Sequence, residues 1–176
     1  MTSAAVVRVL SLEVGDQVER DGLVEDLLRI GRECARDRVL RLLGYRDRTI
    51  SELNKRLRDD GYADEIADGL VARFVELGYL DDEMFAQRWT AARRQAGFGP
   101  SRIERELRTK GIAQELARSA AYTSDDEELL ASARSLISRI DLSDAAARKR
   151  AFAKLIRKGY SPTIAGRAIG SGGAEE

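Results

Sequence analysis

Three stretches of this sequence align on a glycine, and this alignment constrains the fold more than any other feature. The stretches are ELNKRLRDDGYADEIADGL, IERELRTKGIAQELARSA and RAFAKLIRKGYSPTIAGRA, which share Gly61, Gly111 and Gly159 respectively. The glycines recur at roughly 50-residue intervals, a period that is typical of stacked helical units. The sequence therefore predicts a chain built from repeats.

Each of these glycines follows an amphipathic helical pattern and is predicted to end it. A left-handed glycine at the end of a helix brings together the side chains four residues before it and one residue after it, as in a Schellman ending. The predicted pairs are Leu57 with Tyr62, Leu107 with Ile112, and Leu155 with Tyr160. The helices that end at Gly61 and Gly111 are preceded by helix-start signals, the capping box Thr49 to Glu52 and the pair Gly99 with Pro100. Ser161 with Pro162 is the corresponding signal for the helix that follows Gly159.

Helical periodicity dominates the sequence after Leu23, and only two prolines interrupt it. The predicted helices are 32–44, 50–60, 64–77, 82–96, 100–110, 113–122, 126–140, 144–158 and 162–169. We predict an all-α fold, an elongated tandem array of three three-helix repeats with a short, poorly ordered N-terminal segment. The predicted segments are a lead-in (1–22, a short strand at VRVLSLEV or disordered), the first repeat with an extended first helix (23–80), the second (81–124), the third (125–170) and a disordered tail (171–176).

Composition narrows the possible chemistry. The chain has no histidine, which removes the commonest general base and metal ligand, and its single cysteine cannot form an internal disulfide. These absences narrow the range of possible enzymes sharply, although sites built from carboxylates alone, such as magnesium sites and carboxylate pairs, stay open. We expect no catalytic residues, no cofactor and no metal. Cys34 lies on an apolar helix face and is expected to be a packing residue. A lone cysteine, the lack of a long apolar run and the lack of an export signal favour a cytoplasmic protein with no membrane contact.

The acidic pair in LGYLDDEMFA raises the question of an active site, but local structure explains it. Asp81 is predicted to cap the helix that follows, with Asp82 and Glu83 in its first turn, where carboxylates are stabilised. Leu80 and Phe85 then occupy the positions of a hydrophobic staple. The apolar face continues from Phe85 through Trp89, Ala92 and Ala96. Asp82 or Glu83, if exposed, could instead bind a partner.

Basic residues are predicted to form a stripe on the second and third repeats. On the helix 100–110, Ile103 and Leu107 are expected to face inward with arginines opposite, and on the helix 144–158 the apolar face is expected to comprise Ala151, Phe152, Leu155 and Ile156. The predicted stripe comprises Arg93, Arg94, Arg102, Arg105, Arg108, Lys110, Arg150, Lys154 and Arg157. Such a stripe can contact a phosphate backbone or an acidic protein surface. The alternative is a solvated helix face that neighbouring acids such as Glu104 and Glu106 balance.

Four motifs carry a resemblance to a known family: RDRTISEL (46–53), LGYLDDEMFA (77–86), GPSRIERELRTKGI (99–112) and LIRKGYSPTIAGRAI (155–169). With them the sequence resembles the RecX family of bacterial regulatory proteins, which bind the RecA recombinase. The resemblance covers residues 32–170, and VGDQV (14–18) is similar to the lead-in of family members.

The resemblance implies a non-enzymatic protein that lies in the groove of the RecA–DNA filament, bridges adjacent subunits and restrains ATP hydrolysis, strand exchange and the SOS response. We accordingly expect a monomer that binds the RecA nucleoprotein filament, and single- or double-stranded DNA without strong sequence preference. One alternative is a stand-alone DNA-binding regulator, because a helix, a glycine turn and a second helix also describe a helix-turn-helix. Another is a helical scaffold for some other acidic protein.

Overall fold

The structure, a computed structural model, describes residues 20–170, and the regular structure in that range is entirely helical. The helices are α2 (Arg20–Tyr45), α3 (Ile50–Asp59), α4 (Asp64–Glu76), α5 (Asp82–Gln95), α6 (Pro100–Thr109), α7 (Gln114–Ala121), α8 (Asp126–Ile137), α9 (Ala145–Lys158) and α10 (Pro162–Gly170). The all-α prediction is confirmed. The predicted lead-in strand and the C-terminal tail lie outside the described residues.

The first helix, α2, begins at Arg20, which is well before the predicted range 32–44 and close to Leu23, where the helical periodicity begins. Its additional turns carry Leu27, Leu28 and Ile30, which pack against the same hydrophobic core as the rest of α2. Gly22 and Gly31 lower the helix propensity of this stretch. Packing against the core compensates for that low propensity.

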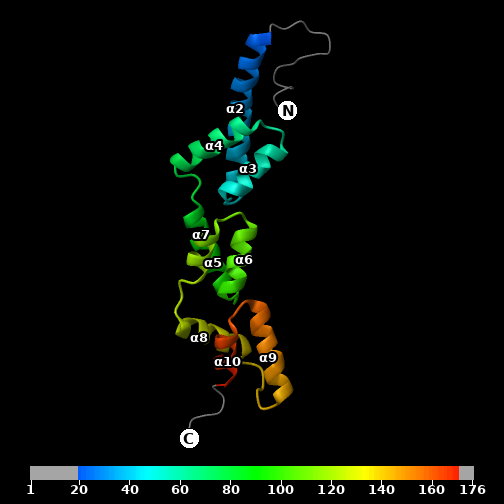
Figure 1. Cartoon of the computed structure of the whole chain (residues 1–176), viewed down its shortest axis with the longest axis vertical. Coiled ribbons are helices and arrows are strands. Elements are labelled where there is room, and N and C mark those ends of the chain that lie inside the picture. Colours follow the sequence, from blue (N-terminus) through cyan, green and yellow to red (C-terminus); the bar gives the residue numbers. More distant parts are fainter. Residues whose placement is uncertain (1–19, 171–176) are drawn as a thin grey trace. The chain divides into compact units, whose positions relative to one another are not determined.

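The described residues divide into two compact units, and the boundary lies between Phe85 and Ala86. In the first unit α2 and α3 both pack on α4 (Figure 1). The largest fully buried side chains there are Val39, Leu53, Leu57 and Leu80. Cys34 packs against this core, as its position on an apolar face predicted.

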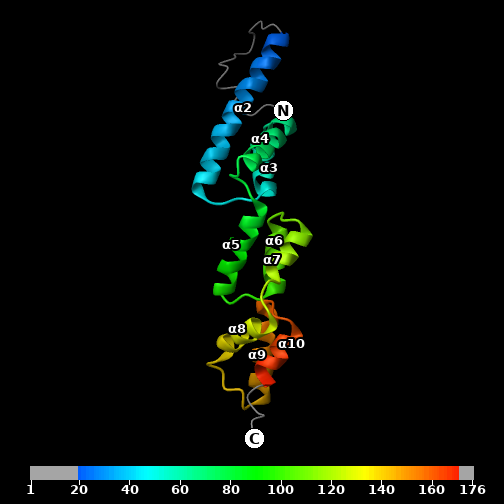
Figure 2. The ribbon, with the colours of Figure 1, turned by 90° about the vertical axis from the view of Figure 1, so that its left-hand side faces the viewer.

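In the second unit α6 pairs with α7, and α8, α9 and α10 surround a common core (Figure 2). That core consists of Leu130, Ala133, Ile137, Ala151, Leu155, Tyr160, Ile164, Ala165 and Ala168. The helices of the described range thus follow one another in sets of three. The proposed limits of the three repeats stay a prediction, because the two compact units place the second and third sets together.

The three aligned glycines end their helices in the predicted way. Gly61, Gly111 and Gly159 have φ values of 87°, 83° and 95°. The N–H after each glycine donates to the carbonyl of the leucine: Tyr62 to Leu57 (3.1 Å), Ile112 to Leu107 (3.1 Å) and Tyr160 to Leu155 (3.2 Å). All six of these residues are buried. The prediction of three equivalent helix endings is confirmed.

Two further glycines make the same ending, which the repeat alignment did not include. Gly78 and Gly97 both have φ of 75°, and the residues after them donate to carbonyls in the last turns of α4 and α5. These bonds run from Tyr79 to Phe74 (2.9 Å) and from Phe98 to Arg93 (3.0 Å). One helix-ending geometry therefore recurs through both units.

The acidic pair after Leu80 starts a helix and also joins two helices. The Asp81 carboxylate accepts a hydrogen bond from the Met84 N–H (2.9 Å), so Asp81 caps α5 as predicted. Asp82 is half-buried, and its carboxylate accepts from the Ile50 N–H at the start of α3 (2.9 Å). The expectation of an exposed Asp82 that binds a partner is therefore wrong, because this carboxylate is used to cap α3.

The predicted apolar face of α5 is also partly wrong. Phe85 is buried, but Ala92 and Ala96 are exposed. The buried side of the helix instead continues through Ala86 and Thr90, one position along from the predicted row. Small alanines do not fix the orientation of a helix in the way that large side chains do, because they bury little area.

Within the second unit, the end of α9 meets the start of α6. The first N–H groups of a helix and its last carbonyls have no partner within the helix. Here the Gly99 N–H donates to the Lys158 carbonyl (2.8 Å), and the Ser101 N–H donates to the Gly159 carbonyl (3.2 Å). A Cβ atom on Gly99 would lie 2.5 Å from the Gly159 carbonyl carbon, so glycine permits this approach.

Two glycine-to-alanine changes in the second unit test this junction, and a third serves as their control. In Gly159→Ala the new Cβ would lie 2.5 Å from the Arg102 Cβ, and the residue would also keep a left-handed backbone. We expect Gly99→Ala and Gly159→Ala each to lower the free energy of unfolding by at least about 2 kcal/mol. The measurement is urea unfolding followed by the fluorescence of Trp89, the only tryptophan in the chain.

The matched control is Gly166→Ala in α10, where a Cβ would meet nothing within 4 Å. Because alanine is the better helix former, this variant should be more stable by about 0.5–1 kcal/mol. Equal effects at all three glycines would contradict the close approach of α6 and α9.

The role of Asp82 can be tested with two variants, the isosteric Asp82→Asn and the truncated Asp82→Ala. Burial raises the pKa of Asp82 above its ordinary value, although the hydrogen bond from Ile50 acts in the opposite direction. Stability that protonated Asp82 contributes is thus lost as the pH rises through the raised pKa. Asp82→Asn should abolish this pH dependence and keep the cap, whereas Asp82→Ala should be about 1 kcal/mol less stable than Asp82→Asn. Urea unfolding followed by circular dichroism between pH 4 and pH 7 measures both; equal stabilities of the two variants would contradict the cap.

Candidate functional site

Helix α6 presents two arginines outward. Ile103 and Leu107 are fully buried, as predicted, and Arg105 and Arg108 lie on the opposite, exposed side. The guanidinium groups of these two arginines form no ion pair with any side chain of residues 20–170. They are therefore available to a partner.

A single carboxylate holds two of the other predicted interface residues. Glu106 accepts hydrogen bonds from Arg93 through both of its oxygens, and from the Arg102 Nε (3.1 Å). The hydrogen bonds from Arg93, and then those from Arg102, hold the pKa of Glu106 below its ordinary value. Arg102 thus lies beside the buried row of α6 and not opposite it, which corrects its predicted position. Glu106 does balance positive charge, but that charge belongs to Arg93 and Arg102.

Cations also cover the aromatic rings next to this carboxylate. Arg93, Arg102 and Lys158 lie over the Phe98 ring at 4.7, 4.3 and 4.1 Å from its centroid. Over the Trp89 ring, Lys110 lies at 4.3 Å and Arg93 at 5.1 Å. A nucleic-acid base could stack on these rings only by displacing the cations, and each such contact contributes about 0.5–1 kcal/mol. The cluster is consequently suited to holding α5, α6 and the end of α9 together.

Two more predicted interface residues bind helix ends. Arg94 donates through Nη2 to the Ala121 carbonyl (3.2 Å) and to the Thr123 hydroxyl (2.8 Å), at the end of α7. Lys154 donates to the Leu136 carbonyl in the last turn of α8 (2.7 Å). Cations at the C-terminal ends of helices satisfy free carbonyls and interact favourably with the helix dipole. Both side chains therefore stabilise the fold.

The predicted stripe separates into two groups. The residues engaged within the second unit are Arg93, Arg94, Arg102, Lys110 and Lys154. The other group, which we call the four exposed arginines, comprises Arg105, Arg108, Arg150 and Arg157. The junction between the end of α9 and the start of α6 links the two helices that carry them.

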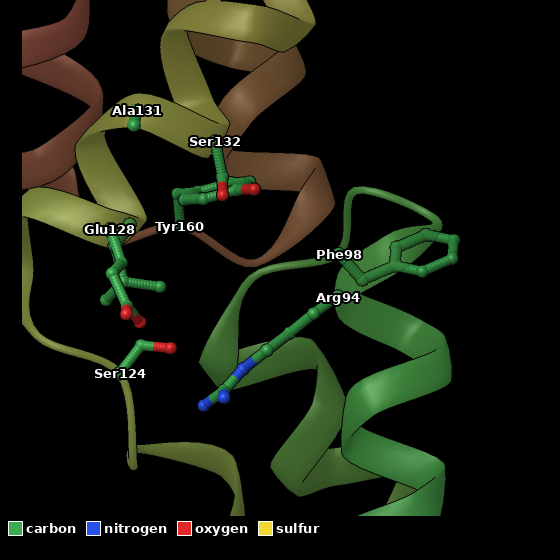
Figure 3. Close-up of a pocket in the computed structure, with 8 residues that line it drawn as sticks. Arg94, Phe98, Ser124, Glu128, Ala131, Ser132 and Tyr160 are labelled. Atoms are coloured by element: carbon green, nitrogen blue, oxygen red, sulfur yellow. The ribbon is translucent and has the colours of Figure 1, made fainter.

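A cavity of about 410 Å³ lies between the end of α5 and helix α8 in the second unit. Its lining residues are Arg94, Phe98, Ser124, Glu128, Leu129, Ala131, Ser132 and Tyr160. Figure 3 shows the Arg94 guanidinium, the Ser124 hydroxyl and the Glu128 carboxylate directed toward the same part of the cavity. These groups can form hydrogen bonds and an ion pair, but the chain has no histidine to activate either serine. Burial raises the pKa of Tyr160, which favours its neutral hydroxyl.

Acidic side chains and Cys34 do not gather into groups of three or more that could hold a metal ion, as far as residues 20–170 are concerned. No helix within this range has the length and apolar character needed to cross a membrane.

The cluster in which Arg93 and Arg102 contact both Glu106 and Phe98 was not predicted from the sequence. Its signal in the sequence is an aromatic residue between Gly97 and Gly99, with the acidic residue Glu106 between the basic residues Arg105 and Arg108 of α6.

The Glu106 carboxylate provides a pH-dependent test of the cluster. Its lowered pKa means that its contribution to stability is present above its unfolded-state pKa and is lost as the pH falls through the folded value. We expect Glu106→Gln to cost on the order of 1–2 kcal/mol at pH 7, and the difference from the wild type to shrink toward pH 3. Urea unfolding across this pH range, followed by Trp89 fluorescence, measures the effect.

Glu104→Gln is the control for that experiment, because Glu104 precedes Glu106 on the same helix and forms no ion pair within the described range. It should leave stability nearly unchanged. A pH-independent cost at Glu106, or an equal cost at both glutamates, would show that the ion pairs do not stabilise the protein.

Family models match two parts of the chain. Residues 35–74 match the one described as RecX, first three-helix domain, and residues 81–120 match the one described as RecX, second three-helix domain. The regulatory protein RecX of Mycobacterium avium is 34% identical over 140 residues, which cover 76% of this chain and 81% of that protein. The regulatory protein RecX of Streptomyces coelicolor is 35% identical over 143 residues, which cover 78% of this chain and 76% of that protein.

Solved structures share the fold. The crystal structure of RecX from Lactobacillus salivarius matches with a TM-score of 0.75 at 20% identity, over 80% of this chain and 96% of that one. A second crystal structure, of a regulatory protein RecX, matches with a TM-score of 0.73 at 19% identity, over 93% of this chain and 83% of that one. Together with the identity and coverage of its relatives, these matches show that the chain belongs to the RecX family of regulatory proteins.

Proposed function

We propose that this protein is a non-enzymatic regulator of RecA that binds the RecA–DNA filament in its groove. There it bridges adjacent subunits and restrains ATP hydrolysis, strand exchange and the SOS response. It acts in the cytoplasm as a monomer. The observation that carries this proposal is the identity of about one third, over three quarters of the chain, to proteins named regulatory protein RecX.

The four exposed arginines support the proposal. They are free of the ion pairs that hold Arg93 and Arg102, so a partner can bind them without disrupting the fold. Arginine forms forked contacts with phosphate and carboxylate groups. A nucleoprotein filament offers both, as DNA phosphates and as acidic side chains. Contacts of this kind to DNA carry no strong sequence preference.

The direct test is RecA ATP hydrolysis on single-stranded DNA. The wild-type protein should lower the rate, and the double variant Arg105→Glu/Arg108→Glu should need about a tenfold higher concentration for the same effect. The variant should keep the circular dichroism spectrum of the wild type, because both side chains are exposed.

A double variant in the first unit, Arg41→Glu/Lys55→Glu, controls for net charge. Both of its positions are exposed and free of ion pairs within the described range, and the change in net charge is the same. It should act like the wild type. A wild-type protein that neither binds the filament nor changes ATP hydrolysis would defeat the proposal. Selection of one preferred duplex sequence from random oligonucleotides would instead favour a stand-alone helix-turn-helix regulator.

A further inference from the structure

Helix α9 exposes two large apolar side chains that were predicted to belong to its buried face. Phe152 is 37% exposed and Ile156 is 38% exposed. The residues of α9 that pack into the core of the second unit are Ala151 and Leu155, with Ala147 one turn earlier. The predicted apolar face was therefore too wide. Phe152 and Ile156 are four residues apart and lie next to each other on the helix surface.

The same helix has an uncompensated positive charge. The sequence of α9, AAARKRAFAKLIRK, contains no acidic residue. Three basic side chains of α9 form contacts within the unit: Lys154 with the Leu136 carbonyl, Lys158 with the Phe98 ring, and Arg148 with the Leu142 carbonyl (3.3 Å). The remaining basic side chains of the helix are exposed, and they form no ion pair with any residue in the described part of the chain. These are Lys149, Arg150 and Arg157.

The helical period arranges these groups in order around the exposed side of α9. Phe152 and Ile156 lie at one edge, Lys149 and the small Ala153 follow, and Arg150 with Arg157 lies at the other edge. An apolar strip therefore runs parallel to a basic strip. The alanine between the strips permits close approach of another chain.

We propose that this surface docks an acidic amphipathic segment of a protein partner. We call it the α9 face and define it as Lys149, Arg150, Phe152, Ala153, Ile156 and Arg157. The segment would place apolar side chains against Phe152 and Ile156 and carboxylates against the basic edge. Charge complementarity selects an acidic partner, and the paired apolar side chains select a protein over DNA, because a phosphate backbone offers them no apolar contact.

This inference rests on the proposed function only in the choice of RecA as the partner that supplies the segment. It gives the α9 face a different task from Arg105 and Arg108 on α6. The α9 face binds the protein part of the filament, whereas the α6 arginines also serve the DNA phosphates.

The first arm of the test measures filament binding and bare-DNA binding separately. Phe152→Gln/Ile156→Gln keeps helix propensity and changes exposed side chains. It should weaken binding to the RecA–DNA filament by about tenfold. Binding to bare single-stranded DNA at the same salt concentration should stay at the wild-type level. The control, Leu40→Gln/Val75→Gln, removes apolar side chains of comparable exposure from α2 and α4 and should bind the filament normally.

The second arm uses a synthetic helical peptide with leucines at every third or fourth position and glutamates beside them. Fluorescence anisotropy should show binding to the wild type and at least about tenfold weaker binding to Phe152→Gln/Ile156→Gln. Replacing the glutamates by lysines should abolish binding. If the wild type does not bind the filament but binds the peptide through Phe152 and Ile156, the proposed function fails, whereas the proposal that the α9 face docks an acidic segment is supported.

Three results would contradict the proposal that the α9 face docks an acidic protein segment. The first is a Phe152→Gln/Ile156→Gln variant that binds both the filament and the peptide as the wild type does. The second is an equal loss of filament and bare-DNA binding, which would make the helix a nucleic-acid contact. The third is binding to vesicles of phosphatidylglycerol through Phe152 and Ile156 without any binding to the peptide, which would make it a membrane contact.

Discussion

The left-handed glycine that ends a helix is the interaction on which the rest of the structure depends. At Gly61, Gly111 and Gly159 it lets the following N–H reach back to a carbonyl in the last turn, and it buries a leucine against the next side chain. The chain is thereby turned so that the next helix begins within five residues. Short helices of this kind are marginal alone, because they bury little apolar area. Fixed endings allow them to share a core instead.

Helix ends also make tertiary contacts within each unit. In the first unit the Asp82 carboxylate at the start of α5 caps α3, and in the second unit the carbonyls that end α9 accept from the N–H groups that start α6. Both contacts satisfy backbone groups that a helix cannot satisfy by itself. The second requires glycine on both sides, at Gly99 and Gly159. A small residue at a helix end thus has a tertiary role as well as a local one.

The sequence was sufficient for features that depend on local geometry. The helix ending at Gly159 could be predicted because a left-handed glycine and its apolar pair lie within six residues of one another. Features that depend on tertiary packing were missed. The sequence around Asp82 does not show that α3 lies against this carboxylate. Likewise, the helical position of Phe152 does not show that Ala151 is buried in the core while Phe152 stays partly exposed. Glu106 was expected to balance its neighbours on α6, but α5 brings Arg93 to it.

Glu106 also determines which arginines remain available for binding. It holds Arg93 and Arg102 at the contact between α5 and α6, where a half-buried carboxylate needs opposite charge. Arg105 lies on the other side of the same helix and stays in water, where an ion pair would contribute little to stability. The arginines that stabilise the fold are thus different from those that a partner can reach. A partner can therefore neutralise Arg105, or the acid-free surface of α9, without weakening the helix contacts that hold these groups in place.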